Sequence, residues 1–108
     1  MRKKRNAVEA GSGDVFTDLG FADAPERKLR VQLAMRLNAL IASRGLPQSA
    51  VAALFGIPQP HVSDLTNYKL SRFSSERLLR FVTLLDHDVE IVIRPKSRRR
   101  ATGTLSVS

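Results

Sequence analysis

The sequence predicts a small, mainly α-helical domain of four to five helices, followed by one β-strand near its C-terminal end. Three observations predict this fold. Leucine recurs at helical spacing over residues 23–44 and again over 74–85. Two shorter apolar runs lie between these stretches, and apolar side chains then occupy every second position of 88–94. The chain has 108 residues and is 43% hydrophobic, which suits one small core.

The first expected helix is long. Asp23 and Glu26 form a helix start signal, and Pro25 is tolerated in a first turn. Gly45 should end the helix, since glycine readily adopts a left-handed conformation. Its apolar stripe consists of Leu29, Leu33, Leu37, Leu40 and Ile41.

Two short helices are expected next, from Pro47 or Gln48 to Phe55 and from Gln59 to Thr66. Gly56 separates them and allows a sharp turn because it has no Cβ. Val62 and Leu65 share one face of the second short helix and should point inward. That arrangement leaves the opposite face polar and exposed.

The fourth helix should begin after Ser74, a good N-cap residue, and run to about Leu85. The strand that follows has Val89, Ile91 and Ile93 on one face, and Pro95 ends it. A single strand cannot satisfy its own backbone donors and acceptors. We therefore expect it to pair with a second copy across a two-fold axis, giving a homodimer. Pairing with residues 15–19 of the same chain is the alternative.

The net charge of +8 is unevenly distributed. Residues 14–26 carry −4, 27–80 carry +7, and 94–108 carry +5. This balance suits a polyanionic partner, most simply DNA or RNA. We expect a flexible N-terminal segment at 1–22, a folded domain at 23–94 and a basic disordered tail at 95–108. No cysteine and no membrane-length apolar run occur, so a cytoplasmic protein without a membrane partner is expected.

The polar face of the helix at 59–66 is the main candidate site. A helix of this width fits the major groove of DNA, where side chains reach base edges. Gln59 can pair bidentately with adenine, whereas Asp64 can accept from cytosine or pair locally with an arginine. Lys69 and Arg72 follow in a loop suited to phosphate contacts. The candidate DNA-contacting residues on the helix and just after it are Gln59, Pro60, His61, Ser63, Asp64 and Asn67.

These residues resemble the Cro/cI-repressor, or Xre-type, helix-turn-helix family. The matching positions are Gln48, Ala52, Gly56, Ile57, Gln59 and the pair Val62-Ser63. The resemblance implies that Gln48 contacts phosphate and supports Gln59. Departures from the family pattern are Pro47 and Pro58 at helix N-caps, Pro60 in a first turn, and Tyr68 where glycine is common.

The wider sequence is similar to the HigA-type antitoxins of RelE-like toxins. The similar stretches are FTDLGF, KLSRFSSERLLRFV and DVEIVIRP. This resemblance implies a dimer that represses its own operon at an inverted-repeat operator and neutralises a small basic toxin. The acidic segment at residues 14–26 would contact the toxin through Val15, Phe16, Leu19 and Phe21. The alternatives are a stand-alone Xre-type repressor, or a toxin-binding adaptor that does not bind DNA.

The sequence does not favour enzymatic chemistry. His61 and His87 are far apart, and Asp86 and Asp88 flank an expected turn. No glycine-rich phosphate loop occurs, and Ser74 has no neighbouring histidine base. No cofactor, metal site or catalytic residue is therefore predicted.

Overall fold

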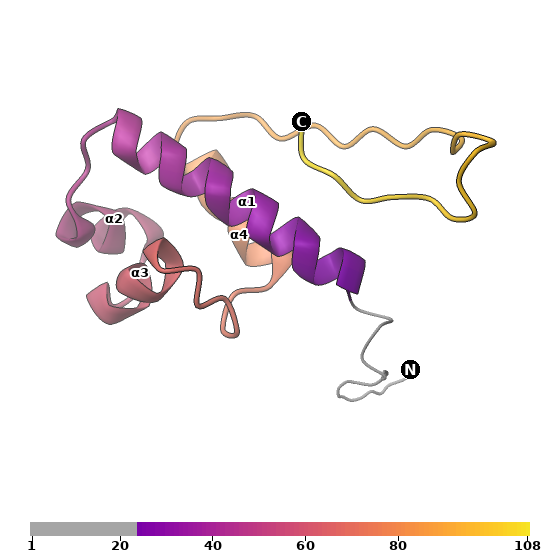
Figure 1. Ribbon diagram of the computed structural model, residues 1–108. Helices are drawn as coiled ribbons and strands as arrows, with labels where there is room; N and C mark the ends of the chain where they lie inside the picture. Colours follow the sequence, from indigo (N-terminus) through magenta and orange to yellow (C-terminus); the bar gives the residue numbers. More distant parts are fainter. Residues whose placement is uncertain (1–23) are drawn as a thin grey trace.

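The computed structural model describes residues 24–108, which form four α-helices followed by an open C-terminal segment (Figure 1). The helices are α1 (Ala24–Ser43), α2 (Gln48–Phe55), α3 (Gln59–Thr66) and α4 (Ser75–Leu84). α1 packs against α4, and α2 packs against α3. The mainly helical prediction is confirmed. The expected cap residue Asp23 and the apolar residues of the N-terminal segment lie outside the described residues.

α1 supports the other helices through one buried stripe. Leu33, Leu37 and Ile41 are buried, as the helical spacing predicts. Leu29 and Leu40 of the predicted stripe are only partly buried, and Ala34, which was not in it, is buried as well. α1 ends at Ser43, and Gly45 just beyond it has a left-handed φ of 62°. There, the Gly45 N–H donates to the Ala42 carbonyl at 3.1 Å, and the Leu46 N–H donates to the Ile41 carbonyl at 3.2 Å. These two hydrogen bonds form a Schellman motif, in which the left-handed residue is usually glycine.

Aromatic side chains complete the core between α2 and α4. The ring of Phe81 on α4 stacks on Phe55 of α2, with centroids 4.2 Å apart. Phe73, in the loop before α4, meets Phe81 edge to face at 6.1 Å and is almost fully buried. Neither Phe73 nor Phe81 was among the expected core residues. Their rings link α2 and the loop to α4.

The helix N-termini are capped unequally. The Ser74 hydroxyl accepts a hydrogen bond from the Arg77 N–H at 3.1 Å, which confirms Ser74 as the N-cap of α4. Pro47 and Pro58 precede α2 and α3 with extended backbones, and neither provides a side-chain cap. The first turns of α2 and α3 therefore lack the cap that serine or threonine would supply.

The strand expected at 88–94 is not formed within residues 24–108. These residues have no regular structure and run away from the helices as an open segment (Figure 1). Ile91 and Ile93 are 72% and 93% exposed. The expectation of a strand is therefore wrong for residues 24–108, because a strand forms only when a second segment pairs with its backbone. Residues 15–19, the alternative partner, lie outside the described residues.

The last residues of the chain return to α1. The Val107 N–H donates to the Gln32 side-chain oxygen at 3.1 Å, and Arg36 donates to the Ser108 carbonyl at 3.3 Å. Val107 is partly buried against the core. The segment expected to be a disordered tail thus contacts the helical domain at its end.

Candidate nucleic-acid interface

The turn between α2 and α3 fixes the angle of the two helices. Gly56 has a left-handed backbone with φ 68° and ψ 38°. The Ile57 N–H donates to the Ala52 carbonyl at 3.1 Å, and Ile57 itself packs against the core. Below this turn, Val62 and Leu65 of α3 are completely buried. The buried pair therefore orients α3 so that its other face is turned to solvent.

An open hollow lies where the first turns of α2 and α3 meet. Its volume is about 360 Å³, and its lining is formed by Gln48, Gln59, Pro60 and Ser63. Gln48, Gln59 and Pro60 are exposed, and Ser63 is half-buried. The fold thus brings together residues of two helices that the sequence suggested as DNA contacts. An amide pair at such a position can donate to and accept from a base edge or a phosphate.

The C-terminal half of α3 is held by local polar contacts. The Asp64 carboxylate pairs with the Arg72 guanidinium at 3.2 Å. The Asn67 amide donates to the Ser63 carbonyl at 2.9 Å and contacts the Ser63 hydroxyl at 3.4 Å. Of the two roles open to Asp64, this geometry favours local pairing. The Asp64–Arg72 pair offsets a negative charge that would otherwise repel phosphates.

Other predicted residues surround this core of the site. Lys69 is exposed, and its side chain forms no hydrogen bond or ion pair within the part of the chain that the structure describes. His61 lies half-buried on the flank of α3.

Residues 24–108 contain no group of three or more potential metal ligands. No helix in the same range is long and apolar enough to cross a membrane.

Tyr68 follows α3 in a left-handed conformation, with φ 61°. Glycine adopts this conformation without steric cost, whereas other residues strain their Cβ against the following carbonyl. Tyr68 therefore occupies a backbone conformation that glycine would adopt without strain. The Tyr68 N–H donates to the Leu65 carbonyl at 3.2 Å, which helps to hold the turn.

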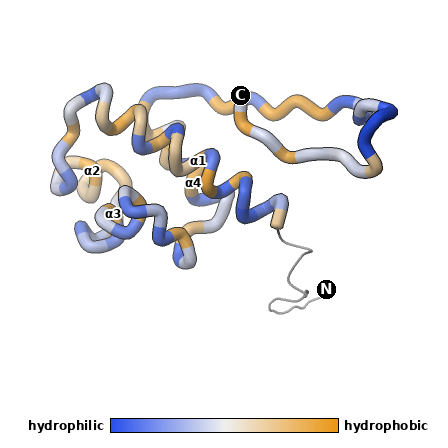
Figure 2. Tube along the Cα trace, viewed as in Figure 1, coloured by the Kyte–Doolittle hydropathy of each residue, from blue (hydrophilic) through white to orange (hydrophobic). Residues whose placement is uncertain are grey.

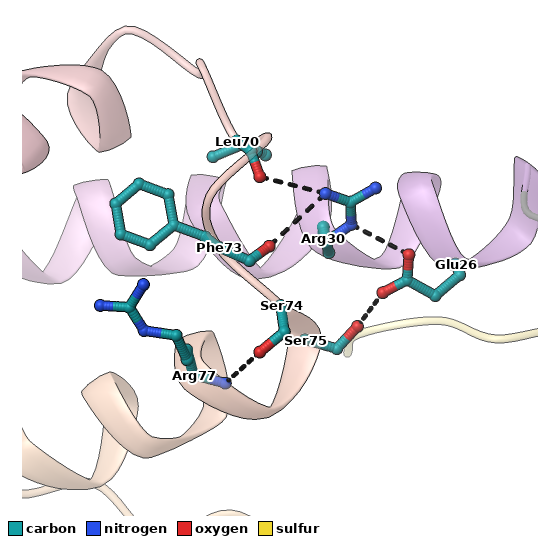
Figure 3. Close-up of polar contacts among 7 residues, drawn as sticks. All are labelled: Glu26, Arg30, Leu70, Phe73, Ser74, Ser75 and Arg77. Atoms are coloured by element: carbon teal, nitrogen blue, oxygen red, sulfur yellow. Dashed lines mark hydrogen bonds and ion pairs between the residues drawn. The ribbon is translucent and has the colours of Figure 1, made fainter. Parts of the chain in front are cut away.

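Arg30 of α1 holds the loop that follows α3 (Figure 3). Its guanidinium donates to the carbonyls of Leu70 at 3.1 Å and Phe73 at 3.4 Å, and it pairs with Glu26 at 2.9 Å. Glu26 also accepts a hydrogen bond from the Ser75 hydroxyl, at the start of α4. The Arg30 side chain is only 18% exposed. This network, which we call the Arg30 clamp, connects α1 to the loop between α3 and α4.

Asn38 extends the same support to α3 itself. Its amide donates to the Leu65 carbonyl at 3.3 Å, near the C-terminal end of α3. The sequence did not indicate that Arg30 or Asn38 supports the site, since the three backbone carbonyls that they bond lie 27 or more residues away. Arg30 lies off the leucine stripe, which is the pattern of an ordinary solvated side chain. No local sequence signal distinguishes it from such a residue.

Two short helices joined by a tight turn, the second presenting a polar face, define a helix-turn-helix DNA-binding protein. Residues 15–94 match a family described as a helix-turn-helix domain, and the chain belongs to that family. It is also similar to a solved structure that bears the name of an XRE-family transcriptional regulator. The two are 53% identical with a TM-score of 0.75, over 80% of this chain and 97% of the other. No curated protein matches the chain.

Proposed function

We propose that this XRE-family DNA-binding regulator is the antitoxin of a type II toxin–antitoxin module. In this proposal it neutralises a RelE/HigB-like toxin in the cytoplasm and represses its own operon as a homodimer. The observation that carries the DNA-binding part is the orientation of α3. Its apolar side is completely buried at Val62 and Leu65, so its polar side is available to a major groove.

Each part of the interface has a distinct proposed role. Gln59 contacts a base, and Gln48 beside it contacts a phosphate and positions the Gln59 amide. Pro60 contacts a thymine methyl group, and Ser63 bonds a base or phosphate. Lys69, in the loop after α3, contacts a phosphate, because it is exposed and has no hydrogen-bond or ion-pair partner within residues 24–108. His61, Asn67 and Arg72 border this surface.

Dimerisation is proposed through the segment 88–94. Ile91 and Ile93 are largely exposed, and the backbone of this segment is unpaired in the described chain. A second copy of the segment would satisfy that backbone and cover the apolar side chains, including Val89. Such a dimer would place two α3 helices on an inverted repeat, with half-sites about 34 Å apart.

The toxin-binding part is supported by charge and resemblance. Residues 14–26 carry −4 and include Val15, Phe16, Leu19 and Phe21, which lie outside the described residues. An acidic segment with apolar anchors suits a small basic protein. The solved XRE-family relative supports a second candidate, a transcriptional regulator without a toxin, because its name mentions regulation alone.

The DNA-binding proposal is tested with the protein's own promoter and a scrambled duplex of equal length. Gln59→Ala should reduce the preference for the promoter by about 5- to 150-fold, the effect of losing one bidentate base contact worth roughly 1–3 kcal/mol. Met35→Ala is the matched control, since Met35 is a similar-sized side chain that is 56% exposed on α1. Unchanged promoter preference in Gln59→Ala would contradict the assigned role of α3.

The antitoxin proposal is tested by deleting residues 1–22. The truncated protein should bind the promoter normally but fail to rescue cells that express the small basic protein encoded next to its gene. Full rescue by the truncated protein would place toxin binding elsewhere in the chain. Absence of any such neighbour, with promoter binding intact, would support the stand-alone regulator.

A further inference from the structure

A second strongly basic surface lies in the C-terminal segment, outside the helix-turn-helix. Five cationic side chains occur within residues 94–100, a stretch we call the basic turn: Arg94, Lys96, Arg98, Arg99 and Arg100. All five are exposed, and none has a side-chain partner in the described part of the chain. No acidic residue follows Glu90 in the sequence. Within residues 24–108, no ion pair therefore neutralises the positive charge of this turn.

Hydrogen bonds give the basic turn a defined backbone and attach the segment after it to α1. The Arg99 N–H donates to the Ser97 hydroxyl and the Arg100 N–H to the Ser97 carbonyl, both at 3.2 Å. Beyond the turn, Val107 and Ser108 are bonded to Gln32 and Arg36 of α1. Residues 86–108 consequently form a loop that leaves the helices and returns to them. The arginines lie at its tip, where Figure 2 shows a strongly hydrophilic stretch.

The tip of this loop is remote from the recognition surface. In Figure 1, α2 and α3 lie on one side of α1 and α4, and the turn extends on the other side. The helices α1 and α4 thus lie between the basic turn and the surface formed by Gln48 and Gln59, and we treat the two as separate surfaces.

We propose that the basic turn is a second DNA-contacting site, which binds backbone phosphates outside the half-site contacted by α3. This inference rests on the proposed DNA-binding function. Residues 94–100 contain no aromatic or large apolar side chain that could anchor in a protein pocket. Adjacent arginines repel each other, and closely spaced phosphates relieve that repulsion while releasing counterions. Phosphate contacts of this kind strengthen binding without specifying sequence.

The test compares two variants that lose the same net charge. Arg98→Gln/Arg99→Gln removes two cations of the basic turn, and Lys28→Gln/Arg80→Gln removes two exposed cations of α1 and α4. Binding is measured against salt concentration on a short duplex that covers only the operator, on a longer duplex with flanking DNA, and on a scrambled long duplex. Circular dichroism confirms that both variants remain folded.

The basic-turn variant should show a slope of log affinity against log salt that is smaller by about 2 units, since each phosphate contact contributes about 0.9. The control should keep a slope close to the wild type. A decrease of the slope on long duplexes alone would show that the basic turn contacts flanking DNA of the same duplex. A decrease on all duplexes, with complexes that contain two duplexes, would show that it contacts a second DNA molecule. Both outcomes support the proposed site.

Equal slopes for the basic-turn variant and the control would overturn the proposal, because the effect would then be one of net charge alone. Failure of the proposed function gives a different result. A wild-type protein that binds promoter and scrambled DNA equally would lack sequence recognition. The slope on scrambled DNA would still decide whether the basic turn contacts phosphates.

Discussion

Replacing Arg30 with glutamine tests how α1 supports the proposed DNA interface. Arg30 makes charge-assisted bonds to two loop carbonyls and to Glu26, and its side chain is only 18% exposed. Glutamine is neutral and shorter, so the carbonyls of Leu70 and Phe73 lose their donor. Hydrogen bonds to a charged group contribute about 1.5–3 kcal/mol each, and the 3.4 Å bond is the weaker. We expect the free energy of unfolding to fall by about 2–3 kcal/mol.

The stability effect is measured by urea and thermal unfolding followed by circular dichroism. For a domain of this size, 1 kcal/mol changes the melting temperature by about 4–8 °C, so we expect a decrease of about 10–20 °C. DNA binding is measured at a temperature where the variant is folded. Lys69, the proposed phosphate contact, lies in the loop that the Arg30 clamp holds, so the salt slope should fall by about 1 unit.

Two further variants separate the parts of the Arg30 clamp. Glu26→Gln removes the ion pair but leaves the carbonyl contacts of Arg30, so it should cost under about 1 kcal/mol and leave the salt slope unchanged. Arg30→Lys keeps the charge but has one nitrogen in place of the two that Arg30 uses, so it cannot bond Glu26 through Nε and the two carbonyls through Nη1 at once, and should give an intermediate result. Wild-type stability in Arg30→Gln would refute the clamp. Lower stability with an unchanged salt slope would show that Arg30 does not position the phosphate-contacting loop.

Three other predictions concern backbone conformation and assembly. Tyr68→Gly should raise the free energy of unfolding by about 0.5–1 kcal/mol in urea titrations, since glycine adopts the left-handed φ without strain; destabilisation would contradict this. Gly56→Ala should lower it by about 1 kcal/mol through the backbone alone, because nothing lies within 4 Å of an added Cβ. An unchanged denaturation midpoint would show that the turn accommodates alanine. Ile93→Glu should convert the proposed dimer to a monomer in light scattering, and a wild-type monomer at the same concentration would exclude pairing through 88–94.

The sequence by itself determined the helices and the turn between α2 and α3. Gly45, Gly56 and Ser74 act on the backbone within a few residues of themselves, and the structure places them at the helix ends as expected. The inward direction of Val62 and Leu65 follows from helical spacing in the same way. The polar face of α3 could therefore be derived from local pattern alone.

Only the tertiary structure decided how that face is supported and what surrounds it. The stacking of Phe81 on Phe55 requires helices distant in sequence to meet, and a strand at 88–94 would require a partner that residues 24–108 do not supply. Arg30 and Asn38 bond to backbone carbonyls, an acceptor that every residue possesses. Such a hydrogen bond does not depend on which residue carries the carbonyl, so no residue pattern predicts the bond. The backbone preferences of a segment depend on neighbouring residues, whereas these tertiary contacts form only when the chain has folded.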